Sequence, residues 1–125
     1  MHPVLQATID ESVAAFGVER FTFTERPDGS VKVTVRGLDL GDTWSPQMSE
    51  ITTNLLVSFP ATQPYPFYLP ATLTRPNGVA MPSNFQQVTV DDQLVWQLSV
   101  RPLGGRSVDS FPALIAGVVS WIRSH

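Results

Sequence analysis

The chain of 125 residues contains no cysteine, and its two histidines, His2 and His125, stand at the two ends. The absence of cysteine excludes disulfide bonds, thiolate metal sites and thiol nucleophiles together. Only carboxylates remain as internal metal ligands, and no Asp/Glu cluster has the spacing of a calcium loop. Gly104-Gly105 also lacks the strand-to-helix context of a phosphate loop. We therefore expect no metal and no cofactor.

Basic charge is also scarce. The chain has 8 basic and 11 acidic residues, a net charge of −3, and Lys32 as its single lysine. Without a basic stripe, we expect no nucleic-acid partner. No apolar run reaches membrane-spanning length, and Met1-His2-Pro3 is not followed by a signal-peptide pattern. These absences favour a cytoplasmic protein with no membrane contact.

What is present suits an ordered core. Hydrophobic residues make up 42% of the chain and charged residues 15%, and no repeat or linker divides it. Its length is typical of one domain, so we expect a single domain over residues 1–125.

Helical periodicity marks the two ends of the chain. Leu5, Ile9, Val13 and Phe16 recur at helical spacing and predict a helix over about residues 3–16. The apolar stripe over residues 111–122 predicts a second helix, capped by Asp109 or Ser110.

Strand-like alternation fills the middle. Two alternating runs, 21–24 and 31–36, flank a Pro-Asp-Gly turn and predict a hairpin. We expect a loop over 37–50, a strand over 51–59, a fourth strand over 68–74, irregular structure over 75–84, a second hairpin over 88–100 that turns near Asp91-Asp92, and a loop over 101–106. The predicted class is α+β: an N-terminal helix, an antiparallel β-meander, a hairpin and a C-terminal helix on one sheet.

Residues 59–70 hold four prolines and four aromatic residues. Proline fixes its own φ and donates no backbone hydrogen bond, so this stretch predicts a stiff, extended connector and a poor interior strand. We expect its aromatic rings to lie against the body of the domain.

The spacing Tyr65-Pro66-x-x-x-Pro70, after Phe59-Pro60, resembles the YPxxxP signature of the ubiquitin-conjugating-enzyme (UBC) and RWD fold. The predicted order of elements around it also resembles that fold. The single closing helix matches compact, RWD-like members, and the resemblance to compact prokaryotic members implies a bacterial origin.

The family's chemistry is a thioester on a cysteine that follows a His-Pro-Asn motif. Here Arg75-Pro76-Asn77 departs from that motif and no cysteine follows, so thioester transfer is excluded. An alternative is an active protein that forms an oxyester through Ser83, with Asn84 as an oxyanion donor. Its base would be Asp91 or Asp92, which are more simply explained as turn residues.

Binding is then the main expectation. In the family, the residue after Tyr-Pro is often an exposed aromatic that docks partners, and Phe67 stands there. The competing interpretation buries Phe67 and exposes Tyr68. The resemblance also makes the N-terminal helix a docking surface, with Gln6 and Asp10 facing outward.

The leading hypothesis is a catalytically inactive UBC/RWD-like scaffold or adaptor. The partner implied by the resemblance is a ubiquitin-like protein or an activating-enzyme-like protein in a bacterial ubiquitin-like conjugation pathway. The alternatives are the Ser83 oxyester enzyme and a generic α+β protein-interaction module. The sequence leaves homo- or hetero-oligomerisation open.

Overall fold

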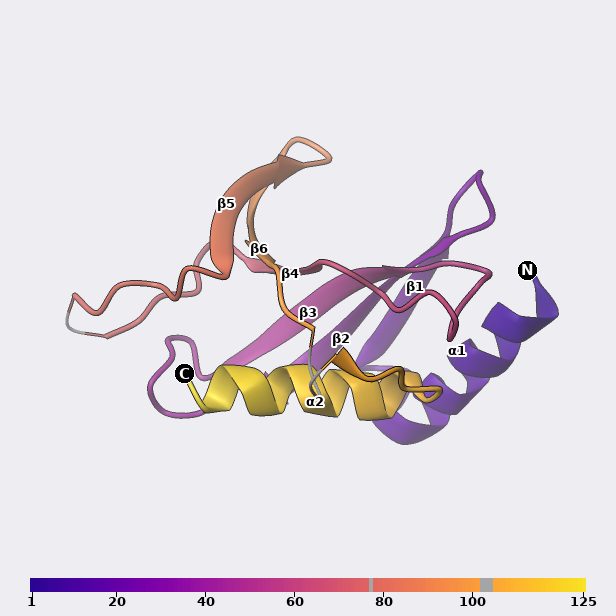
Figure 1. The fold of residues 1–125 in the computed structure, drawn as a ribbon, viewed down its shortest axis with the longest axis horizontal. Helices are drawn as coiled ribbons and strands as arrows, with labels where there is room; N and C mark the ends of the chain where they lie inside the picture. The colour runs from indigo at the N-terminus through magenta and orange to yellow at the C-terminus, as the bar shows by residue number, and fades with distance from the viewer. Residues whose placement is uncertain (77, 102–104) are drawn as a thin grey trace.

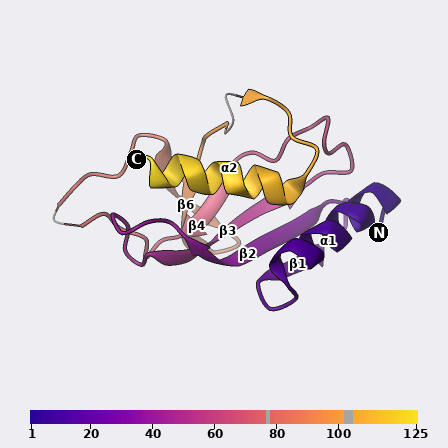
Figure 2. The same cartoon turned by 90° about the horizontal axis from the view of Figure 1, so that it is seen from below.

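The computed structural model describes residues 1–76, 78–101 and 105–125. These residues contain, in chain order, α1 (Pro3–Phe16), β1 (Phe21–Glu25), β2 (Val31–Asp39), β3 (Met48–Leu55), β4 (Phe67–Pro70), β5 (Phe85–Val90), β6 (Gln93–Leu98) and α2 (Phe111–Arg123). The strands form one antiparallel sheet in the order β1-β2-β3-β4-β6-β5. Both helices lie on the same face of this sheet (Figures 1 and 2), which confirms the predicted α+β class.

The helices begin and end where the sequence indicates. Pro3 occupies the first turn of α1, and Gly17 ends the helix with a φ of 89°. Ser110 caps α2, because its side chain accepts a hydrogen bond from the backbone N–H of Ala113. Buried Leu5 of α1 and the apolar stripe of α2 belong to the core beneath the sheet.

Alternation along the strands gives the sheet two different faces. The buried residues of β2 and β3 pack in the core with the helices and include Val31, Val33, Val35, Ile51 and Leu55. The residues between them, such as Lys32 and Thr52, face the other side and are half-buried. In β2 and β3 one face is therefore core and the opposite face is polar, whereas in β1 Phe21 is buried and Phe23 is exposed.

The predicted boundaries around β2 and β3 are wrong, and β3 begins at Met48. The loop over 37–50 is shorter, because β2 continues to Asp39 through a register shift after Val35, with Gly37 at a φ of 67°. The strand over 51–59 stops at Leu55, where the chain turns and the N–H of Phe59 donates to the carbonyl of Leu56.

The proline stretch is also more regular than predicted. Its last four residues form β4 in the interior of the sheet, between β3 and β6. Pro66 precedes this short strand and Pro70 ends it, so the missing N–H groups fall at its limits. The predicted strand over 68–74 accordingly begins one residue earlier and ends four residues earlier.

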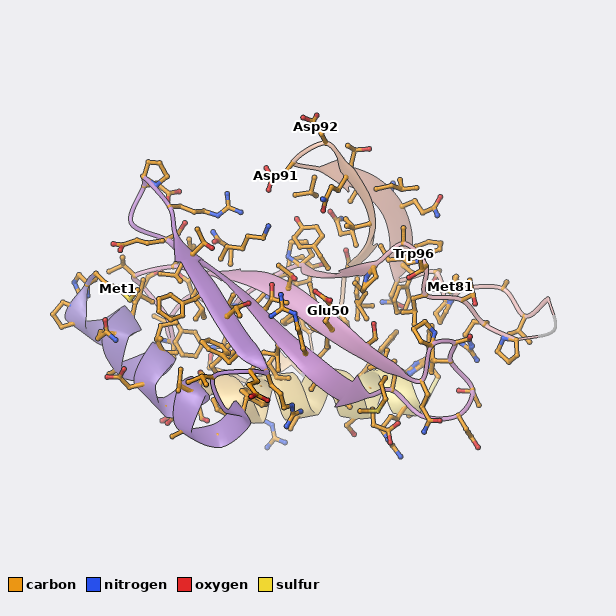
Figure 3. All side chains as sticks on the ribbon, turned by 180° about the vertical axis from the view of Figure 1, so that it is seen from behind. Met1, Glu50, Met81, Asp91, Asp92 and Trp96 are labelled. Carbon is orange, nitrogen blue, oxygen red and sulfur yellow. The ribbon has the colours of Figure 1, made fainter. Side chains whose placement is uncertain are left out.

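The second hairpin has the predicted turn, but it begins at Phe85 and ends at Leu98 and does not run over 88–100. Asp91 and Asp92 make its two-residue turn, with φ angles of 51° and 63°, and β5 pairs with β6 along its whole length. The hairpin bends away from the helices and projects from the body (Figures 1 and 3). The predicted loop over 101–106 lies partly outside the described residues. Across the described segments, neither helix has the length and apolarity to cross a membrane.

Candidate functional site

Ser83 lies exposed in the turn before β5. Within the described residues its hydroxyl has no hydrogen-bond partner. Asn84 is already engaged, because its side-chain amide donates to the carbonyl of Ser99 at 3.0 Å and its own carbonyl accepts from the Ser99 N–H at 2.9 Å. Asp91 follows the opposite end of the six-residue β5, which is roughly 20 Å long at about 3.3 Å per residue. No base therefore stands beside Ser83 in the described parts of the chain.

Phe67 cannot be the docking aromatic that the sequence suggested, because its side chain is fully buried. It lies on the core side of β4, as does Leu69, and this alternation places Tyr68 on the opposite face. The competing interpretation, which buries Phe67, is therefore correct for Phe67. It also expected an exposed Tyr68, and this residue is only half-buried.

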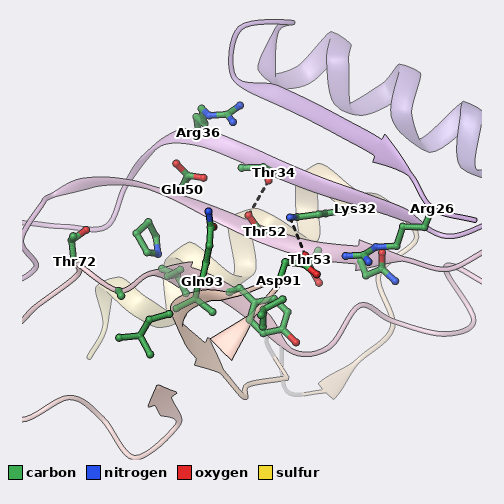
Figure 4. A pocket seen from close by; sticks show the side chains of 18 residues that line it. Arg26, Lys32, Thr34, Arg36, Glu50, Thr52, Thr53, Thr72, Asp91 and Gln93 are labelled. Carbon is green, nitrogen blue, oxygen red and sulfur yellow. Dashed lines mark hydrogen bonds and ion pairs between the residues drawn. The ribbon is translucent and has the colours of Figure 1, made fainter. Parts of the chain in front are cut away.

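The polar face of the sheet carries a hollow with a volume of about 680 Å³. Strands β2, β3 and β4 form its floor, and the turn of the β5–β6 hairpin stands beside them as a wall (Figure 4). We call it the open-face groove. The lining residues used below are Arg26, Lys32, Thr34, Thr52, Asn54, Tyr68 and Asp91.

Two interactions order this groove. The hydroxyl oxygens of Thr34 and Thr52 lie 2.8 Å apart across β2 and β3. The ammonium of Lys32 lies 3.8 Å from a carboxylate oxygen of Asp91 and joins the floor to the hairpin turn (Figure 4). Because the two side chains are 41% and 64% exposed, this ion pair holds the wall weakly.

The groove also contains unused hydrogen-bonding capacity. The Nε of Arg26 and the Oδ1 of Asn54 are buried, and neither has a hydrogen-bond partner within the described segments. Such atoms are costly to leave unpaired, so a ligand that offers one acceptor and one donor would be stabilised here once these side chains turn toward it. Polypeptide backbone offers both groups.

The remaining predicted contact residues lie elsewhere. Gln6 donates a hydrogen bond to Asp10 at 2.9 Å on the exposed side of α1, and α1 covers the sheet face opposite the groove. Tyr65 is exposed, with the guanidinium of Arg101 4.4 Å from its ring centre. The structure thus separates Tyr68 from Gln6 and Asp10.

The groove was not predicted from the sequence, because the alternate polar residues of the strands were interpreted as a surface in contact with water. The available signal was that β2 and β3 both carry polar residues at alternate positions, which pairing brings together, as in Lys32 opposite Asn54. The curvature of the hairpin over that face had no signal in the sequence.

No group of three or more potential metal ligands occurs among the described residues. Comparison of the chain with protein families, curated proteins and solved structures finds no match.

Proposed function

We propose that the protein is a catalytically inactive, UBC/RWD-like adaptor in a bacterial ubiquitin-like conjugation pathway. The observation that carries this proposal is the open-face groove, a partly polar hollow of about 680 Å³, in a chain that has no cysteine. The groove would serve as the surface for a partner, and the chain lacks the cysteine that thioester chemistry needs.

The UBC/RWD part of the proposal is supported by the order of elements around residues 65–70. An N-terminal helix and three meander strands precede this hexapeptide, and a C-terminal helix closes the chain. Its middle residues are packed into the domain, because the hydroxyl of Thr53 donates to the carbonyl of Pro66 at 3.0 Å and Phe67 is buried.

The proposed partner is a ubiquitin-like or activating-enzyme-like protein that lies on the open face, with Tyr68 as its aromatic contact. Tyr68 loses little conformational entropy on binding because it stands on a paired strand. A second contact would be the exposed pair Gln6 and Asp10 on α1.

The experiment is calorimetric titration of the cognate ubiquitin-like protein and activating enzyme into the wild type, Tyr68→Ala and a Gln6→Ala/Asp10→Ala variant. Binding weakened about tenfold or more by Tyr68→Ala, at the scale of an interface anchor, would support the open face. Binding lost only in the α1 variant would move the contact to the helix.

A parallel incubation with activating enzyme, ubiquitin-like protein and ATP tests catalysis. We expect no covalent adduct. A hydroxide-labile adduct that disappears in Ser83→Ala would instead establish an oxyester enzyme.

A further inference from the structure

Strand β5 is one edge of the sheet, and no strand within the described segments pairs with its outer side. It is the last strand in the order β1-β2-β3-β4-β6-β5 and, among the residues that the structure describes, it pairs only with β6. Its six residues pair without any register shift. The strand lies on the part of the hairpin that projects from the body (Figure 1).

The register identifies which backbone groups point outward. The two-residue turn at Asp91-Asp92 is closed by Val90 opposite Gln93. In antiparallel pairs, hydrogen-bonded and non-hydrogen-bonded positions alternate. The N–H and C=O groups of Gln86, Val88 and Val90 therefore point toward β6, and those of Gln87 and Thr89 point away from it.

The two edge strands of the sheet, β1 and β5, differ in their surroundings and in their sequences. Strand β1 lies beside α1, since the N-terminal ammonium of Met1 is 3.6 Å from Glu25 and the ring of Phe16 stacks on Phe21. Strand β5 has the sequence FQQVTV, without charge, proline, glycine or bulge. Natural proteins use charged residues, prolines and bulges to prevent pairing at a sheet edge, and β5 contains none of these.

We propose that two copies of the chain associate through β5, antiparallel, so that each copy's Val88 stands opposite Val88 of the second copy. In this register Gln87 and Thr89 exchange backbone hydrogen bonds with Thr89 and Gln87 of the second copy. Each of these two residue pairs exchanges two backbone hydrogen bonds, so four new bonds form. Gln86 then stands opposite Val90.

A second copy fits this edge because pairing brings no like charges together. Asp91 and Asp92 at the end of one strand would lie opposite Phe85 and Asn84 of the other copy, at the two far ends of the interface. Each β5 edge is used once, so the two-fold contact closes as a dimer and does not propagate.

Sedimentation equilibrium from about 1 µM to about 1 mM, the range of weak to moderate association, tests the proposal. We expect a concentration-dependent dimer. Thr89→Pro removes an outward N–H from each copy and leaves the pairing with β6 intact. It should weaken the dimer about tenfold or more, whereas the control Thr89→Ala should not.

A charge exchange tests the register. Val88→Lys and Val88→Glu each place like charges opposite one another, so each variant alone should be monomeric. A 1:1 mixture should restore a heterodimer, because the two charges then face each other as a pair. Circular dichroism shows that each variant is folded.

Three results would overturn the proposal: a wild type that stays monomeric throughout the range, a dimer insensitive to Thr89→Pro, or a mixture of the Val88 variants that stays monomeric. These outcomes are independent of whether a conjugation partner binds the open face.

Discussion

Phe85 connects parts of the chain that are far apart in sequence. Its ring centre lies 5.4 Å from that of Trp44, 6.2 Å from Trp96 and 6.3 Å from Trp121. The indole N–H of Trp44 donates to the carbonyl of Ile122, so this ring also fixes the end of α2. One buried side chain thus holds together the start of β5, the loop before β3 and the C-terminal helix.

Phe85→Ala should lower the free energy of unfolding by about 3–5 kcal/mol, because it removes a buried ring and leaves a cavity among three tryptophans. Urea unfolding followed by tryptophan emission measures the loss directly. Phe23, which is 44% exposed, provides the control, and its replacement by Ala should cost clearly less. Equal losses in both variants would show that the cluster is not a stabilising centre.

Asp39 makes the stability of the fold depend on pH in the acid range. The N–H of Gly41, the amide of Gln47 and the guanidinium of Arg123 hold the pKa of its carboxyl below the usual 3.8. The charged form is therefore favoured in the folded state. The stabilisation of the fold by this carboxylate is fully present above the ordinary pKa. It is lost as the pH falls through the lower pKa of the folded state.

Asp39→Asn should consequently flatten the dependence of stability on pH below about 4, near the ordinary carboxyl pKa. Denaturation curves recorded at a series of acid pH values test this. Asp42→Asn changes a nearby exposed carboxylate and should leave the slope as in the wild type. An unchanged slope in Asp39→Asn would contradict the assignment.

Among the elements, the β5–β6 turn contains avoidable strain. Asp91 and Asp92 both have positive φ angles, a conformation that glycine adopts without the cost of a Cβ. Asp91 also pairs with Lys32, so Asp92 is the residue that can be exchanged without loss of that contact.

Asp92→Gly should raise the free energy of unfolding by about 1 kcal/mol. Thermal or urea unfolding provides the measurement, and Asp92→Ala, which keeps the Cβ but loses the polar group, should give no gain. A destabilised glycine variant would mean that the Asp92 side chain itself stabilises the turn.

For the whole molecule, the elements with local signals were predictable. The first helix follows from Pro3, its apolar spacing and Gly17, and the second hairpin follows from alternating valines around Asp91-Asp92. Each of these patterns is complete within about 15 residues, the scale on which periodicity is informative.

Features that depend on distant contacts were not predictable. The side chain of Gln63 binds the N–H and the carbonyl of Val108, 45 positions later, and so fixes the proline stretch. The burial of Phe67 depends on which face of β4 meets the helices. The open-face groove depends on how the hairpin curves over β2 and β3, which no single segment specifies.

Stability should also be uneven across the molecule. Strands β2 and β3 lie inside the sheet and contribute many core side chains. The turn of the β5–β6 hairpin lies at the projecting end, where the Lys32–Asp91 ion pair links it to the floor of the groove. We therefore expect slow amide exchange in β2 and β3 and fast exchange near the turn.

Lys32→Met should raise the exchange rates of residues 90–93 about two- to fivefold, the range for an exposed ion pair, and leave β3 unchanged. Hydrogen-exchange mass spectrometry at low protein concentration separates this local opening from association through β5. The control Arg36→Met removes another cation that lines the groove but bonds to Thr22 of β1 and not to the hairpin. If both variants accelerate exchange equally, the hairpin responds to the charge of the groove as a whole. If neither does, the wall of the groove is held by the pairing of β6 with β4, and the ion pair contributes nothing to its position.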